Sequence, residues 1–187
     1  MKKHKTIFAK NRSEWRKWLS KNFDRRDEIW LIFPKKSSGI RGIPYNDAVE
    51  EALCFAWIDS TVQTLDGNNT IHRFSPRNPH SAYSQANKER LRWLNDNNML
   101  HPLVKEAVKN LLNEEFVFPV DIMNAIKKDK TAWENFNKFS LSYKRIRIAY
   151  IDGARKRPEE FKKRLNNFIE KTRKNKIIGY GGIEKYY

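Results

Sequence analysis

The sequence has little of several residue types that often identify a protein class. Its 187 residues include one cysteine and four histidines. A single cysteine excludes an intramolecular disulfide and fits a reducing compartment. No pair of His or Cys residues has the spacing of a metal site. We therefore expect no metal, no cofactor and no disulfide, and we expect Cys54, inside an apolar run, to be a core residue.

Long apolar runs are also missing. No stretch approaches the roughly 20 apolar residues of a transmembrane helix. The basic N-terminal segment Met1–Lys10 is not followed by the hydrophobic region of a secretory signal. These absences predict a cytoplasmic protein without membrane insertion. A chain of this length can form one domain with a substantial core.

Acidic residues are few relative to basic ones. The chain has 38 Lys and Arg against 22 Asp and Glu, a net charge of +16. Residues 138–176 hold 14 of the basic residues and only 4 acidic ones, so they contribute +10 of this charge. Such a field favours polyanions, yet the same composition is typical of a solvated helical surface. The sequence leaves both interpretations open.

Hydrophobic periodicity predicts a mixed first part of the chain. Asn11 is placed to cap a helix, and the apolar run 29–33 is typical of a buried central strand. A second helix is expected at 46–57, with Glu50 and Glu51 on its outer side. Beyond it, two β-prone segments flank a short turn of residues that tolerate positive φ, which predicts an antiparallel hairpin over 61–74.

The rest of the pattern is helical. Ser81 or Ser84 is placed to cap a helix, and Pro102, Pro119 and Pro158 suit the first positions of later helices. The fold class expected is α+β, with a small antiparallel or mixed sheet packed by helices and a basic all-helical C-terminal part. We expect an α+β domain at 1–112 and a helical region at 113–187, packed together as one compact unit.

Two neighbouring segments depart from the usual alternation of core and surface residues. The apolar run 52–58 ends on Asp59, a carboxylate that needs a cationic or donor partner if it is desolvated. Arg73 and Arg77 are the nearest candidates. If the three charges converge, a spare guanidinium group can bind a carboxylate or phosphate; otherwise, the ion pair fixes the hairpin against the helix. The candidate ligand-binding residues are Trp57, Asp59, Ser60, Arg73, Ser75, Arg77, Ser81 and Tyr83.

Two other function classes remain as alternatives. The first is electrostatic nucleic-acid binding, for which the candidates are Lys144, Arg145, Arg147, Arg155, Lys156, Arg157, Lys162 and Lys163. The aromatic residues interleaved with this basic cluster fall on inward helical stripes and are expected to be core: Tyr143, Tyr150, Phe161 and Phe168. The second is a hydrolase or transferase, for which Ser60 or Ser75 can be combined with His72 and Asp59. No nucleophile-elbow motif supports that triad, so we assign no catalytic residue.

These motifs also resemble a known family. The pattern consists of Tyr45, Ala48-Val-Glu-Glu-Ala-Leu-Cys-Phe55, Trp57-Ile-Asp-Ser60, Arg73-Phe-Ser-Pro-Arg77, Ser81, Ser84 and Asn87. It is similar to the bacterial YdeI/OmpD-associated family, also called bacteriocin-protection proteins, over the range from 8 to about 174. The resemblance implies a cytoplasmic α+β protein associated with envelope stress and antimicrobial-peptide tolerance, and no known reaction. We accordingly expect a non-catalytic binding protein with a small anionic ligand, or nucleic acid as the alternative partner.

Overall fold

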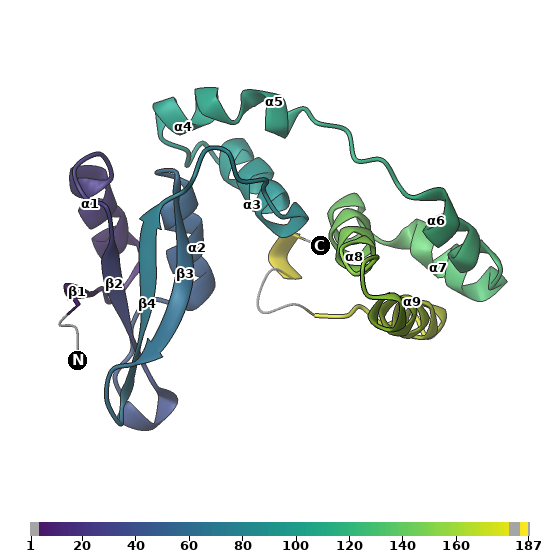
Figure 1. The fold of residues 1–187 in the computed structure, drawn as a ribbon, viewed down its shortest axis with the longest axis horizontal. Helices are drawn as coiled ribbons and strands as arrows, with labels where there is room; N and C mark the ends of the chain where they lie inside the picture. Colours follow the sequence, from purple (N-terminus) through teal and green to yellow (C-terminus); the bar gives the residue numbers. More distant parts are fainter. Residues whose placement is uncertain (1–3, 180–183, 187) are drawn as a thin grey trace. The chain divides into compact units, whose positions relative to one another are not determined.

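The computed structural model describes residues 4–179 and 184–186 (Figure 1). The chain forms two compact units, one from residues 1–82 and 94–109 and the other from residues 83–93 and 110–187. The first unit holds a four-stranded mixed sheet with helices, and the second is helical. The predicted α+β class is therefore confirmed. The periodicity of the sequence does not reveal that segment 83–93 joins the second unit.

The sheet of the first unit has the strand order β1-β2-β4-β3. Its strands are β1 (Thr6–Phe8), β2 (Ile29–Pro34), β3 (Trp57–Thr64) and β4 (Asn69–Pro76). β1 pairs with β2 in parallel, and the other two pairings are antiparallel. β2 is the buried central strand predicted from its apolar run. The predicted hairpin is also confirmed, as β3 and β4.

Two helices cover one face of this sheet (Figure 1). These are α1 (Arg12–Asn22) and α2 (Tyr45–Leu53), and the short η1 (Lys36–Ser38) lies between β2 and α2. Asn11 caps α1 by accepting a hydrogen bond from the Glu14 backbone N–H, as predicted. Trp15 of α1 is fully buried, and its ring centroid lies 5.3 Å from that of Phe74 on β4. The face that carries Phe74 is called the helix side below, and the opposite face is called the open side.

The second helix ends earlier than its apolar pattern indicates. α2 stops at Leu53, and Ala56 adopts a left-handed φ of 57° before the chain enters β3. The residues after Leu53 remain buried, so burial continues where helical geometry does not. Cys54 is a core residue, as predicted, and burial raises the pKa of its thiol to about 12. It is therefore a protonated thiol at neutral pH.

The prediction that Glu50 and Glu51 face outward is wrong. Their exposed fractions are 0% and 1%. Arg12 lies 2.7 Å from the Glu50 carboxylate and 2.8 Å from that of Glu51, and Arg16 lies 2.7 Å from Glu51. Charged side chains are buried when they are paired, and here the partners come from α1. Periodicity within α2 alone does not reveal this neighbour.

The second unit is built from helices. It holds most of α3 (Gln85–Asp96) and of α5 (Lys109–Leu112), and all of α6 (Val120–Lys127), α7 (Lys130–Lys138), α8 (Leu141–Asp152), α9 (Pro158–Arg173) and η2 (Glu184–Tyr186). The end of α3, the first residue of α5 and the whole of α4 (Pro102–Ala107) belong to the first unit. Ser84 supplies the cap of α3, since its hydroxyl accepts a hydrogen bond from the Asn87 N–H. Tyr143 and Phe168 are buried in the main core of this unit, as predicted. Tyr150, also expected to face inward, is 41% exposed.

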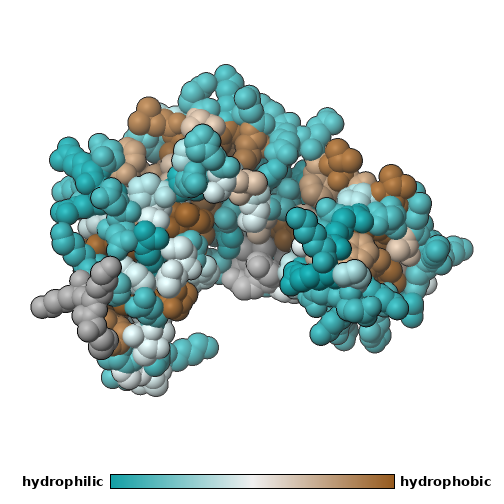
Figure 2. Space-filling view, viewed as in Figure 1, coloured by the Kyte–Doolittle hydropathy of each residue, from teal (hydrophilic) through white to brown (hydrophobic). Residues whose placement is uncertain are grey.

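The visible surface is largely hydrophilic (Figure 2). The hydrophobic areas on this face are small and separated by charged and polar side chains. Among the described residues, no helix is long and apolar enough to cross a membrane.

Candidate functional site

The structure separates the charged residues of the predicted central site. On β4, Arg73 alternates with His72 and Phe74, so it projects to the open side. Asp59 on β3 lies directly opposite Phe74 and therefore shares the helix side. The expected convergence of Asp59 with Arg73 does not occur, because their side chains leave the sheet on opposite faces.

Arg73 has its own partner on the open side. Its Nε donates to a Glu28 carboxylate oxygen at 2.6 Å, and its Nη1 lies 3.4 Å from the Ser60 hydroxyl. The indole N–H of Trp30 also donates to Glu28, at 3.2 Å. The guanidinium group lowers the pKa of Glu28 through its hydrogen bond. Arg73 therefore contributes to an ion pair at the sheet surface.

Arg77 bonds to the backbone of the loop that follows it. Its backbone N–H donates to the Ala56 carbonyl at 2.8 Å. Its guanidinium group donates to the carbonyls of Asn78 and Ser81. These contacts place its side chain over the 78–81 turn, where it stabilises the exit from β4.

The remaining predicted residues do not line one pocket with these charges. Trp57, a candidate ligand-binding residue, is 1% exposed, and its indole N–H donates to the Phe23 carbonyl at 3.0 Å. Ser75 pairs with Ile58 in the sheet and projects to the open side. Tyr83 belongs to the second unit. The combination of Ser60 or Ser75 with His72 and Asp59 is not assembled either, since both serines lie across the sheet from His72.

Asp59 instead belongs to an aromatic cluster on the helix side. Its carboxylate accepts a hydrogen bond of 2.6 Å from the Tyr45 hydroxyl. The His72 ring lies 5.4 Å from Tyr45 and 4.5 Å from Phe33, measured between centroids. Burial lowers the pKa of His72, and the nearby Asp59 charge opposes that shift only in part.

This shift predicts how stability depends on pH. The unfolded chain binds a proton at His72 near pH 6.5, while the folded protein binds it only at lower pH. Stability should therefore decrease as the pH falls below about 6.5. In denaturant titrations at pH 7.5 and pH 5, His72→Gln should lose less stability on acidification than the wild type. His80→Gln, at an exposed loop position, is the control, and equal losses in all three proteins would contradict the assignment.

Several basic residues of the nucleic-acid alternative are engaged in protein contacts. Arg145 holds the Glu89 carboxylate with two hydrogen bonds of 2.7 Å. Arg155 pairs with Asp121 and Asp152. Further members of the set differ in exposure: Arg147 is buried, Lys144 donates to the Asn137 carbonyl, and Lys156, Arg157, Lys162 and Lys163 are exposed. The charge available to a polyanion is thus smaller than the sequence count.

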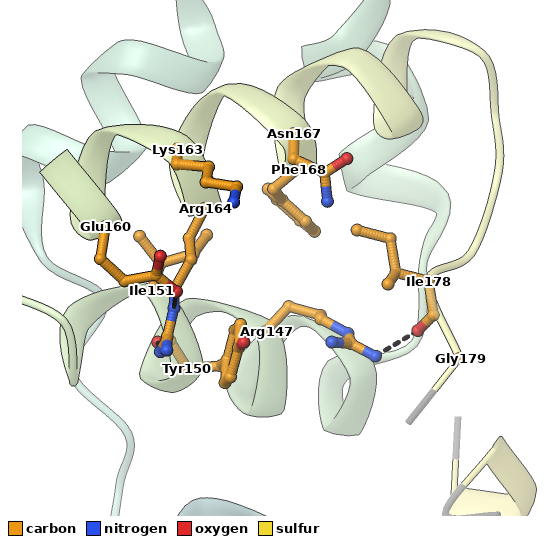
Figure 3. Close-up of a pocket in the computed structure, with 10 residues that line it drawn as sticks. All are labelled: Arg147, Tyr150, Ile151, Glu160, Lys163, Arg164, Asn167, Phe168, Ile178 and Gly179. Atoms are coloured by element: carbon orange, nitrogen blue, oxygen red, sulfur yellow. Dashed lines mark hydrogen bonds and ion pairs between the residues drawn. The ribbon is translucent and has the colours of Figure 1, made fainter. Parts of the chain in front are cut away.

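A cavity of about 380 Å³ lies between α8, α9 and residues 178–179 of the second unit (Figure 3). Ligand pockets typically have volumes of about 300–1,000 Å³. The cavity is lined by Arg147, Tyr150, Ile151, Glu160, Lys163, Arg164, Asn167, Phe168, Ile178 and Gly179. It therefore combines cationic, amide, aromatic and aliphatic groups in a space of ligand size.

Contacts hold two of the arginines in place. The Arg164 guanidinium carbon lies 3.8 Å from the centroid of the Tyr150 ring. Arg164 also donates to the Tyr150 carbonyl at 2.8 Å and to Glu160 at 2.7 Å. The hydrogen bond from Arg164 to Glu160 lowers the pKa of Glu160, so this carboxylate is ionised at neutral pH. On α8, Arg147 donates to the Ile178 carbonyl.

Two donors on α9 have no such engagement. Figure 3 shows the Lys163 ammonium group and the Asn167 amide extending from α9 into the cavity. In the part of the chain that the structure describes, neither side chain has a hydrogen bond or an ion pair, although the Lys163 charge helps to lower the pKa of Glu160. Both residues are exposed, so water can solvate these donors, and a bound molecule with acceptor atoms would replace that water.

The sequence contains one signal for this site, a polar stripe along α9. Glu160, Lys163, Arg164 and Asn167 recur at i, i+3, i+4 and i+7 after Pro158, so they share one face of α9. A polar stripe of this kind is ordinarily solvated. Only the presence of α8 and residues 178–179 beside it turns the stripe into the wall of a cavity.

Two family models match the chain. Residues 7–107 match a domain of unknown function, DUF8412, and residues 115–175 match the family described as bacteriocin-protection, YdeI or OmpD-associated. No curated protein and no solved structure matches the chain. The match at residues 115–175 confirms the family resemblance. The motifs between Tyr45 and Asn87, however, lie in the segment that matches DUF8412. The protein is a member of the DUF8412 family, whose model covers more than half of the chain, and its second unit contains a segment that matches the bacteriocin-protection, YdeI or OmpD-associated family.

Proposed function

We propose that this is a non-catalytic binding protein that holds a small anionic molecule in the cavity between α8 and α9. The observation that carries the proposal is the pair of donors, Lys163 and Asn167, that extend into a cavity of about 380 Å³ (Figure 3). An anion would accept hydrogen bonds from both. This proposed site is in the second unit, whereas the site predicted from the sequence was the Asp59, Arg73 and Arg77 cluster of the first unit.

The charge balance of the lining favours an anion over a neutral ligand. Arg147, Lys163 and Arg164 supply three cations, and Glu160 supplies one carboxylate that Arg164 already holds. Charge-assisted hydrogen bonds are stronger than neutral ones. The remaining lining includes apolar surface, so the ligand that fits best has an anionic group joined to a small apolar part.

The family match supports a broader role. The cavity-lining residues of α8 and α9 lie within the segment that matches the bacteriocin-protection, YdeI or OmpD-associated family. We propose that anion binding here serves envelope stress or peptide tolerance in the cytoplasm. A protein of charge +16 repels cationic peptides over long range. We therefore propose that tolerance acts through an anionic intermediary or a regulatory ligand, and not through direct binding of the peptide.

Lys163→Ala tests this site. The variant should weaken binding of benzoate or phenyl phosphate about tenfold or more, because a charge-assisted hydrogen bond contributes about 1.5–3 kcal/mol. Isothermal titration calorimetry on the full chain measures the change. Lys162→Ala is the matched control, since it removes the same charge from the same helix at a residue that does not line the cavity.

Two outcomes would overturn the proposal. One is equal weakening by both variants, which would indicate a diffuse field rather than a site. The other is the absence of any anion binding, together with binding of a labelled DNA duplex that persists at physiological salt. That second result would favour the nucleic-acid alternative, whose affinity depends steeply on salt concentration.

A further inference from the structure

Three aromatic rings meet on the helix side of the first unit. They come from Phe33 on β2, Tyr45 at the start of α2 and His72 on β4. Their centroids lie 4.5 to 6.1 Å apart, and each pair of ring planes is inclined by 51° to 61°. The rings thus point their faces in different directions instead of forming one flat stack.

The carboxylate beside these rings has no cationic partner. Among the residues that the structure describes, Asp59 bonds only to the Tyr45 hydroxyl. Other carboxylates of the first unit are paired with arginine: Asp47 and Glu50 with Arg12, Glu51 with Arg12 and Arg16, and Glu28 with Arg73. Asp59 thus keeps a negative charge beside three rings without an ion pair in the described part of the chain.

The cluster is negative and open to solvent. Burial lowers the pKa of His72, so its ring is neutral at pH 7 and does not offset the Asp59 charge. Tyr45 is 41% exposed, and Val62, which pairs with His72 in the sheet, is 55% exposed. Aromatic faces carry negative potential and attract cations. A cation placed here would contact both the ring faces and the carboxylate.

We propose that Phe33, Tyr45, Asp59 and His72 form a second binding site, which takes an organic cation such as a quaternary ammonium or guanidinium group. Ring faces supply cation–π attraction. Asp59 supplies the countercharge, and with a guanidinium group it also accepts hydrogen bonds. This site lies in the first unit, within the segment that matches DUF8412, and is independent of the proposed anion site.

The test is a titration of the full chain at low ionic strength with choline and, separately, with N-acetylarginine amide. Both should bind the wild type and shift the NMR signals of His72 and Val62. Asp59→Asn should weaken the guanidinium ligand about tenfold, because it loses hydrogen bonds as well as the countercharge. Tyr45→Phe keeps the ring and should retain most choline affinity, whereas Tyr45→Leu should lose it.

Asp66→Asn is the matched control for charge. Asp66 lies in the turn of the same hairpin, where its carboxylate accepts hydrogen bonds from the Asn68 backbone N–H and the Asn69 side-chain amide. Removing its charge should therefore leave both affinities unchanged. The proposal is overturned if neither cation shifts those signals, or if Asp59→Asn and Asp66→Asn weaken binding equally. Lys163→Ala should not affect cation binding, so failure of this site and failure of the anion site are distinguishable. The amide spectrum of each variant verifies its folding.

Discussion

Arg12→Ala should destabilise the first unit by about 3 kcal/mol or more, the cost measured when one partner of a buried ion pair is removed. Arg12 faces both Glu50 and Glu51, which are 0% and 1% exposed. Burial lowers the pKa of Arg12, but the two carboxylates outweigh that effect and raise it above its ordinary value. Denaturant unfolding measures the loss, and hydrogen exchange should locate it in α1 and α2.

Arg73→Ala is the matched control for this prediction. It also removes an arginine that pairs with a glutamate at 2.6 Å, but the two side chains are 35% and 44% exposed. Exposed ion pairs typically contribute about 0–1 kcal/mol. Similar losses for the two variants would show that the Arg12 network is screened by solvent and does not depend on burial.

Phe168→Ala should destabilise the second unit by about 3–5 kcal/mol, the range for removal of a buried aromatic side chain. Phe168 is 1% exposed, and its ring lies 6.2 Å from the rings of both Phe136 and Tyr143, measured between centroids. Its loss removes apolar contacts between α7, α8 and α9. Denaturant unfolding should show the change, with increased hydrogen exchange in these helices.

Val120→Ala provides the comparison within the same unit. Val120 begins α6 and is 73% exposed, so its truncation should change stability by less than about 0.5 kcal/mol. A small effect of Phe168→Ala would mean that α9 does not depend on this core. The cavity between α8 and α9 would then lack the rigid wall on which the proposed anion site depends.

The net charge illustrates how a sequence count differs from a surface property. The 138–176 segment holds 14 basic residues, and its composition alone is compatible with a polyanion site. In the folded unit Arg145, Arg155 and Arg164 hold carboxylates from Glu89, Asp121 and Glu160. Arginines that form such pairs have guanidinium donors committed within the protein. Lys156, Arg157, Lys162 and Lys163 are exposed and form no ion pair in the described part of the chain.

The local elements were largely predictable because their causes are local. Asn11 and Ser84 cap helices through hydrogen bonds to N–H groups three residues away. The turn at 66–69 follows from residues that tolerate unusual backbone angles, and the alternation along β4 follows from strand geometry. Cys54 and Phe168 were assigned to the core from apolar neighbours, and both are buried.

The candidate sites could not be obtained in this way. Asp59 and Arg73 are close in the sheet, yet their faces depend on the register of β3 against β4 and on the irregularity between Asp59 and Val62. A shift of one residue exchanges the faces. The Tyr45 contact with Asp59 depends on where α2 crosses the sheet, which no residue pattern specifies.

The sequence by itself determined the fold class, the hairpin, most helix starts and the family resemblance, because capping, turn chemistry and hydrophobic periodicity act over a few residues. The tertiary structure alone decided which charges are paired. Glu50 and Glu51 became buried because α1 supplies Arg12 and Arg16, and Lys163 and Asn167 came to line a cavity because α8 lies beside α9. The energy of a charge depends on its partners and its exposure to water, and both are set by elements distant in the sequence.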